Sequence, residues 1–181
     1  MKIMAIFLRG INVNGVNIKM DELKSAIESM MYKNVKTILA TGNIIATTAD
    51  DEISYEEHKN RIEKGLSSYF NYEAYIIIKS AKQIHEIIEE SKEHEVPEGY
   101  HHYVFLTKEN IIAEQLKMKF ATCNKAEKEQ LILGEHGIYW IVPKGDTLQS
   151  DFGRLCLGKK EYKRVLTSRT INTIQKISRC L

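Results

Sequence analysis

The chain has 181 residues and a formal net charge of +2, and 43% of its side chains are hydrophobic, which suits one domain or two small ones with a buried core. Its three cysteines, Cys123, Cys156 and Cys180, stand far apart without a C-x-x-C pair. This excludes a zinc framework and an obvious disulfide set, and it favours a cytoplasmic location. The sequence shows neither a secretory signal nor an apolar window of roughly 20 residues, so we expect no membrane partner.

The apolar periodicity of the first half of the chain predicts alternating strands and helices. Gly42-Asn43 is a two-residue signal for a tight hairpin, and Ser54 with Glu57 forms a capping box ahead of a helix. In chain order, the expected elements are a strand at 2–9, a helix at about 19–32, strands at 35–41 and 44–49, a helix at about 54–71 and a strand at 73–80. The order β-α-β-β-α-β is typical of a ferredoxin-like unit.

A connecting helix opened by Ser80 follows, and an acidic segment with Pro97 and Gly99 ends it, which predicts a boundary near residue 95. Beyond the boundary the pattern starts again. The expected elements are a strand at 100–107, a helix capped by Thr107, strands at 129–135 and 138–143 around a turn at His136-Gly137, a short helix near 148–156, a strand at 162–168 and a last helix through Ile174, Ile177 and Leu181. We therefore expect an α+β fold of two ferredoxin-like (βαββαβ) units, 1–95 and 96–181, with mostly antiparallel sheets in one compact body.

The segment LRGINVNGVNIKM has the composition of an anion-binding loop between a strand and a helix. Gly10 and Gly15 have the spacing of a P-loop, but Val16-Asn17 stands where a P-loop needs lysine and then Ser or Thr, so we reject a nucleotide triphosphatase. Glycine-permitted turns can still aim backbone N–H groups at an anion, and Arg9 and Lys19 flank the loop. Alternatively, the asparagines only hold the loop in shape.

Four segments, LRGINVNG, IKMDEL, TGNIIA and TSRTINTIQKI, resemble the signature segments of a widespread bacterial family catalogued as a domain of unknown function, number sixteen ninety-seven. The resemblance extends from end to end of the chain and implies an α+β fold of two ferredoxin-like halves, without an established activity. The chain departs from the family pattern at Asn14, Ala40-Thr41 and Thr170. The positions that match are Arg9, Gly10, Asn12, Gly15, Lys19, Gly42, Asn43, Arg169, Asn172 and Thr173.

We expect the polar members of this set to converge, because strand ends, a hairpin tip and a helix start can meet at one edge of a sheet. Some also have structural explanations: Gly42-Asn43 suits the hairpin turn, and Asn172 with Gln175 suits a helix cap. The ligand would be a small anion, such as a nucleotide or a phosphorylated metabolite, and no cofactor is expected. The residues expected to bind it are Arg9, Gly10, Asn12, Gly15, Lys19, Asn43, Arg169 and Asn172.

RNA is the second candidate partner. Residues 144–181 carry a local charge of +6 and the rest of the chain −4, and the sequence interleaves Tyr162 with Lys163 and Arg164. A solvated basic face is the plain alternative, and an enzyme of unidentified reaction is the third functional class. His85 and Glu89 share a helical face, but the histidines form no H-E-x-x-H motif, so we expect no metal site. The oligomeric state stays open.

Overall fold

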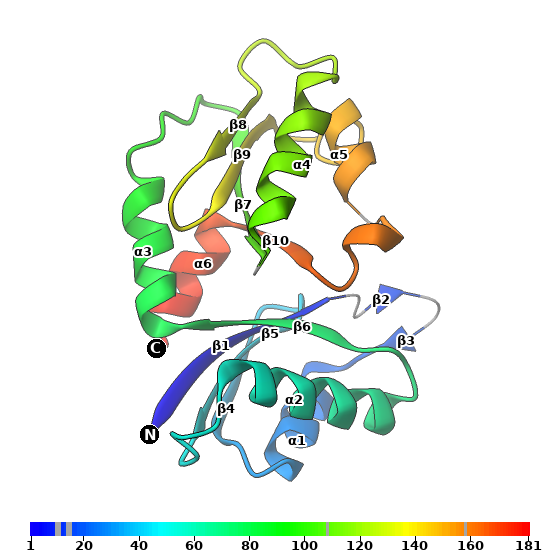
Figure 1. The fold of residues 1–181 in the computed structure, drawn as a ribbon, viewed down its shortest axis with the longest axis vertical. Coiled ribbons are helices and arrows are strands. Elements are labelled where there is room, and N and C mark those ends of the chain that lie inside the picture. The colour runs from blue at the N-terminus through cyan, green and yellow to red at the C-terminus, as the bar shows by residue number, and fades with distance from the viewer. Residues whose placement is uncertain (10–11, 14–15, 108, 158) are drawn as a thin grey trace. The chain divides into compact units, whose positions relative to one another are not determined.

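The computed structural model describes residues 1–9, 12–13, 16–107, 109–157 and 159–181. By its contacts the chain divides into two compact units, Met1–Ile84 with Lys176–Leu181, and His85–Gln175. The predicted α+β fold is confirmed: two four-stranded antiparallel sheets have an order of elements compatible with two ferredoxin-like units (Figure 1). The domain boundary near residue 95 stays a prediction. In the part of the chain that the structure describes, no helix is long and apolar enough to cross a membrane.

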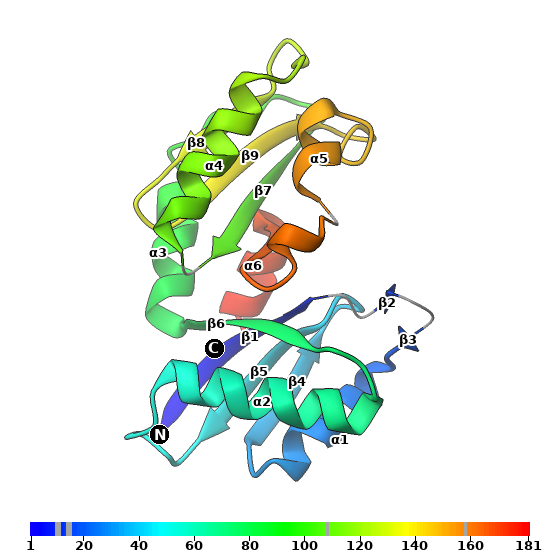
Figure 2. The same cartoon turned by 45° about the vertical axis from the view of Figure 1, so that its right-hand side comes forward.

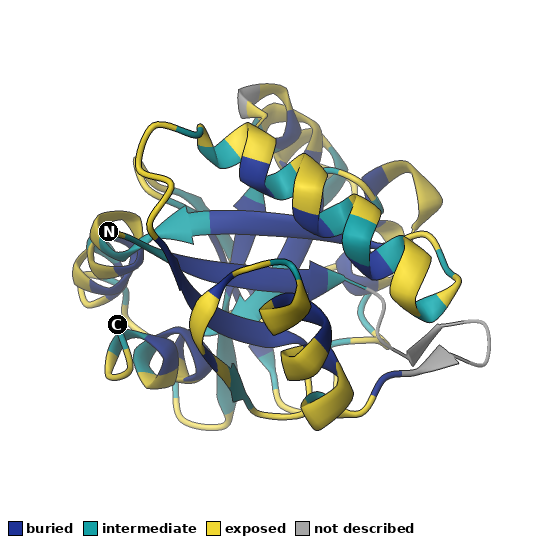
Figure 3. Cartoon of the chain, turned by 90° about the horizontal axis from the view of Figure 1, so that it is seen from below, coloured by how far each residue is buried: buried dark blue, intermediate teal, exposed yellow. Residues whose placement is uncertain are grey.

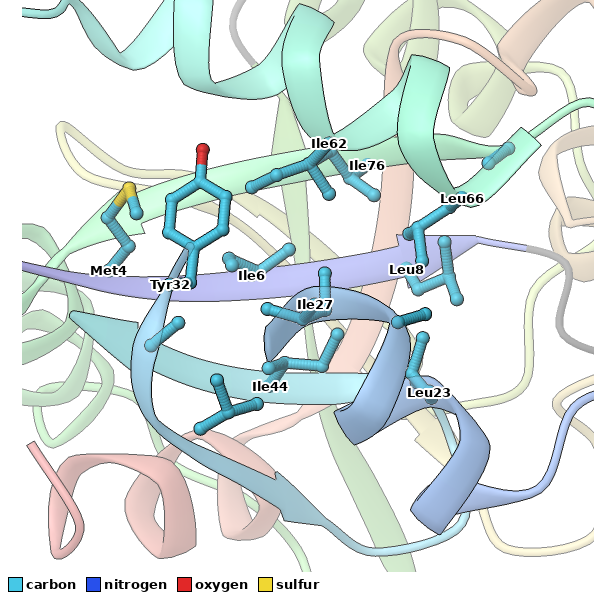
Figure 4. Close-up of a cluster of buried hydrophobic side chains, with 14 of the residues drawn as sticks. Met4, Ile6, Leu8, Leu23, Ile27, Tyr32, Ile44, Ile62, Leu66 and Ile76 are labelled. Atoms are coloured by element: carbon cyan, nitrogen blue, oxygen red, sulfur yellow. The ribbon is translucent and has the colours of Figure 1, made fainter. Parts of the chain in front are cut away.

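The first unit is a sheet with helices on one face (Figure 2). Its strand order is β4 (Lys33–Ile38), β5 (Asn43–Thr48), β1 (Lys2–Arg9) and β6 (Tyr75–Ser80), and its helices are α1 (Met20–Ser29) and α2 (Tyr55–Phe70). Side chains alternate across a strand, so Met4, Ile6 and Leu8 of β1 point together into the core beneath the helices. There they meet Ile27 of α1 and Ile62 of α2 (Figure 4).

Local sequence explains how α2 begins, and a hydrogen bond between α2 and β6 supports the edge strand. The Ser54 hydroxyl accepts a hydrogen bond from the Glu57 amide at 3.2 Å, and the Glu57 carboxylate accepts one from the Ser54 amide at 2.9 Å, which is the predicted capping box of α2. At the edge strand β6, the Glu63 carboxylate accepts a hydrogen bond from the Ile76 amide at 2.8 Å. Figure 3 shows the resulting pattern of buried strands and helices with exposed outer faces.

The second unit repeats this strand order with different packing. Its sheet runs β10 (Leu166–Thr170), β7 (Tyr100–Thr107), β9 (Ile138–Pro143) and β8 (Gln130–Leu133). Its core centres on Trp140. The Trp140 ring stacks on the Phe105 ring, with 6.0 Å between ring centroids, and packs edge-on against the Phe152 ring, with 5.4 Å between centroids. The buried indole N–H donates to the carboxylate of Glu129 at 3.0 Å, which satisfies the one polar group of the side chain. The helices here are α4 (Asn110–Ala121), α5 (Asp151–Cys156) and the 3-10 turn η1 (Lys160–Tyr162).

Helices α3 (Ala81–Ser91) and α6 (Ile171–Ser178) each contribute residues to both units. Ser80 caps α3 as predicted, because its hydroxyl accepts a hydrogen bond from the Gln83 amide at 3.1 Å while the Gln83 side chain accepts one from the Ser80 amide at 3.0 Å. The predicted strand at 162–168 is displaced: its first residue belongs to η1, and β10 begins at Leu166.

The predicted two-residue turn at Gly42-Asn43 is wrong. Ile38 pairs with Asn43 in the β4–β5 ladder, so the connection has four residues, 39–42. Leu39 and Gly42 adopt left-handed conformations, with φ of 59° and 70°. Asn43 is therefore a strand residue, and glycine provides only one of the two left-handed positions that the longer turn needs.

Two predicted helix caps are also wrong. Thr107 pairs with Leu166 as the last residue of β7, so α4 takes Glu109 as its N-cap. Asn172 lies in the first turn of α6, which begins at Ile171, and the residue before the helix, Thr170, accepts a hydrogen bond from the Thr173 amide through its hydroxyl at 3.3 Å. The cap of α4 thus lies two residues later than predicted, and the residue before α6 lies two residues earlier than the predicted cap.

Candidate functional site

Three neighbouring strands of the first sheet start or finish at the same side of the sheet. β1 ends at Arg9, β5 begins at Asn43 and β6 begins at Tyr75, and the antiparallel register pairs Phe7 with Asn43 and Arg9 with Tyr75. Paired residues of neighbouring strands lie on the same face of a sheet, so Arg9, Asn43 and Tyr75 share a face at this edge. The hairpin β2 (Asn12–Val13) with β3 (Val16–Asn17) then leads to Lys19, the N-cap of α1 (Figures 1 and 2). We call this place the Arg9 edge.

Arg9 lies half-buried at the end of its strand, and burial lowers the pKa of its guanidinium below its ordinary value. Arginine remains ionised at neutral pH even so. The side chain has interactions within the structure and is not a free cation. A guanidinium carries five N–H donors, however, so it can keep internal partners and still donate to a ligand. Removal from water strengthens any charge-assisted hydrogen bond that it makes.

Asn43 has a structural position. It is completely buried, and its side-chain amide donates to the Ile38 carbonyl at 2.9 Å and to the Thr41 hydroxyl at 2.8 Å. The Leu8 amide donates to the Gly42 carbonyl at 2.7 Å, which ties the same turn to β1. Asn43 therefore holds the turn against the end of β1, and its two amide N–H groups are engaged in doing so.

Lys19 lies at the opposite extreme of exposure. Its side chain is 79% exposed and its ammonium group is 3.9 Å from the Glu22 carboxylate, a separation and exposure at which an ion pair contributes little. It makes no side-chain cap for α1, although it is the N-cap residue. Asn12 pairs with Asn17 in the β2–β3 hairpin, but its side chain, like Gly10 and Gly15, lies outside the residues that the structure describes.

Arg169 and Asn172 belong to the second unit. One guanidinium nitrogen of Arg169 donates to the Thr167 hydroxyl and to the Ser168 carbonyl, both at 2.8 Å. Asn172 is exposed on the first turn of α6. Within the first unit the structure thus brings Arg9 and Asn43 to one edge, and the convergence of Arg169 and Asn172 with them stays a prediction.

The tyrosine proposed to stack on RNA bases is buried, and the two cations beside it already have interactions within the structure. Tyr162 is 2% exposed, and the ammonium group of Lys119 lies 4.7 Å from its ring centroid. That ring is not available to stack on a base. Lys163 and Arg164 both have interactions within the structure. Charge alone therefore remains in support of the RNA hypothesis.

Sequence reasoning missed a cluster of titratable side chains in the second unit. One ring nitrogen of His94 lies 3.1 Å from one of His102, and the centroids of the His94 and Tyr139 rings lie 4.5 Å apart. The Tyr139 hydroxyl donates to the carboxylate of Glu90 at 2.6 Å. These residues come from three separate segments, so no local motif marks them. Among the described residues, no group of three or more His, Cys, Asp or Glu side chains is arranged to hold a metal ion.

Comparison with known proteins finds a family and a fold. The family model described as "Protein of unknown function (DUF1697)" matches residues 1–139. That range contains the Arg9 edge and leaves Arg169 and Asn172 outside. A solved structure, described as that of the conserved bacterial protein SP0830 from Streptococcus pneumoniae, is similar over 99% of this chain and 97% of its own, with a TM-score of 0.75 and 19% sequence identity. None of the curated proteins compared with the chain matches it.

Proposed function

The chain belongs to the DUF1697 family of proteins of unknown function, and we propose that it binds a small anion, such as a nucleotide or a phosphorylated metabolite, at the Arg9 edge. The observation that carries the proposal is the half-buried guanidinium of Arg9 at a place where β1 ends, β5 and β6 begin, and the path to α1 starts. Strand ends and the loops between them are the usual places for binding residues, because a rigid sheet holds them while their side chains stay accessible.

The start of α1 adds weaker support. Lys19, the N-cap residue, makes no side-chain hydrogen bond to the first amides of α1, and backbone N–H groups at a helix start attract anions. Asp21 and Glu22 lie in the first turn and reduce that attraction, while Lys19 offsets one of them. Because one of these two negative charges is left without an offset at the start of α1, we assign most of the expected affinity to Arg9 and only a small part to Lys19 and the helix start.

The free thiols of the chain agree with a ligand found in the cytoplasm. Cys123, Cys156 and Cys180 are free thiols, and the first two are buried. Free thiols persist in the reducing cytoplasm, where nucleotides and phosphorylated metabolites are abundant. We include the cytoplasmic location in the proposal on this ground.

The test is a calorimetric titration with inorganic pyrophosphate at low ionic strength. We expect the unaltered protein to bind and Arg9→Gln to lose about 10- to 100-fold in affinity, since a hydrogen bond to a charged group contributes roughly 1.5–3 kcal/mol. Lys24→Gln is the matched control, because Lys24 is an exposed cation of α1 that pairs with Glu28 at 3.8 Å. It should leave the affinity nearly unchanged.

A thermal unfolding curve of each variant separates lost binding from lost folding. If Arg9→Gln is folded and binds pyrophosphate as tightly as the unaltered protein, the proposal is wrong. Equal weakening by Arg9→Gln and Lys24→Gln would indicate nonspecific attraction to the surface charge and would also reject a site at Arg9.

A further inference from the structure

The second unit contains a cavity that the anion-binding proposal does not use. It lies between α4 and the segment that leads from η1 into β10, and its volume is about 540 Å³. Sites for small organic ligands have volumes of about 300–1,000 Å³, mostly apolar walls and a few polar groups. The residues that line it are Glu109, Ile112, Gln115, Met118, Lys119, Glu161, Tyr162 and Val165.

The apolar part of the wall combines a fixed floor with an adaptable rim. Ile112 is buried in the core and Val165 packs against the same core cluster. Met118 is 71% exposed and lines the cavity from its solvent side. A methionine adjusts its unbranched side chain to ligands of different shape, so it suits the rim of a binding cavity.

Two charged side chains of the cavity wall, Lys119 and Glu161, are paired with each other and are not available to a ligand. Lys119 forms an ion pair with Glu161, and its ammonium group also lies 4.7 Å from the ring centroid of Tyr162. The Glu161 bond is the main reason why the pKa of Lys119 is raised. These two opposite charges therefore compensate each other inside the wall.

Among the described lining residues, Glu109 carries the remaining charge. Its backbone amide donates to the Thr107 hydroxyl at 3.1 Å, and its carbonyl accepts from the Ile112 amide at 3.1 Å as α4 begins. Within the described residues, its carboxylate has no hydrogen-bond or ion-pair partner. In the described part of its wall, the cavity thus presents the Glu109 carboxylate as an available negative charge beside an apolar surface.

We propose that this cavity binds a small organic cation, a primary ammonium or guanidinium group attached to an apolar body. The cationic group pairs with the Glu109 carboxylate, and the apolar body lies on Ile112, Val165 and Met118. The Gln115 amide at the wall offers a hydrogen bond to a neutral polar group of the ligand. A carboxylate ligand is disfavoured, because Lys119, the cation among the described lining residues, is already paired with Glu161.

Three probes of similar size and different charge test the proposal: 2-phenylethylamine, 2-phenylethanol and 3-phenylpropanoate. Binding is measured on the whole protein in an amine-free buffer by amide chemical-shift perturbation. We expect the amine to shift resonances of α4 and to bind about tenfold more tightly than the alcohol, with the carboxylate weakest. Glu109→Gln should lower the affinity for the amine about tenfold and leave that for the alcohol unchanged.

Glu114→Gln is the matched control, because Glu114 is an exposed carboxylate on the same helix that does not line the cavity. Retained amine binding in this variant supports the proposal. Equal affinity for amine and alcohol, tighter binding of the carboxylate, or equal loss of amine binding in both glutamate variants would overturn it. An absence of shifts on α4 at millimolar amine would overturn it as well.

Discussion

Acid should destabilise the second unit through His102, a residue of β7 that faces the end of α3. Its ring nitrogen lies 3.1 Å from a ring nitrogen of His94, and its ring centroid lies 5.6 Å from that of Tyr139. Glu90 of α3 accepts hydrogen bonds from the Tyr139 hydroxyl and from backbone amides of the β8–β9 turn. Burial, and then the neighbouring His94, lower the pKa of His102 from 6.5 to about 4.

The direction of the effect follows from these pKa values. Above pH 6.5 the imidazole is neutral in both the folded and the unfolded chain, and it contributes no pH dependence. Between pH 6.5 and 4 the unfolded chain binds the proton and the folded chain does not, so the free energy of unfolding falls as the pH falls. Each pKa unit corresponds to about 1.4 kcal/mol, so the shift from 6.5 to about 4 gives an upper bound of about 3.5 kcal/mol. The ring is half-buried and partly screened by water, so we expect a loss of about 1–2 kcal/mol between pH 7 and pH 5.

The assay is urea unfolding followed by the fluorescence of Trp140. It is the one tryptophan of the chain and lies in the core of the second unit, so it reports on the relevant part. His102→Gln should lose about 1–2 kcal/mol less stability between pH 7 and pH 5 than the unaltered protein. His101→Gln is the matched control, because the neighbouring side chain points to the other face of β7 and packs on Tyr103. A pH dependence in His102→Gln equal to that of the unaltered protein would refute the reasoning.

Two further substitutions test the packing. Asn43→Ala should lower the free energy of unfolding of the first unit by about 1–3 kcal/mol, because it removes two buried hydrogen bonds that hold the turn at 39–42. Hydrogen exchange of β5 amides measures this loss, and lost pyrophosphate affinity with unchanged stability would contradict the structural role of Asn43. Gly153→Ala should lower the free energy of unfolding of the second unit by about 1–3 kcal/mol, because the added Cβ would lie 2.0 Å from the Thr147 carbonyl oxygen. Urea unfolding followed by Trp140 fluorescence measures this loss, and an alanine variant of unaltered stability would mean that the backbone moves freely there.

Elements whose signals are local could be predicted from the order of residues alone. The apolar run at 2–9 became β1, and the capping boxes at Ser54 and Ser80 opened α2 and α3. Apolar periodicity and capping depend on residues within about one helical turn or a few strand positions of one another, so they are readable without a fold. The same signals were enough for the order of elements and hence for the fold class.

Tertiary structure decided which side chains are available for chemistry. Asn43 and Tyr162 both read as accessible polar or aromatic groups, yet strand pairing buries the first and packing under Lys119 buries the second. The cavity beside Glu109 and the contact between His94 and His102 join segments that are distant in sequence or belong to different elements. Burial and charge compensation are properties of such neighbours, and only the paired and packed chain determines which neighbours a residue has.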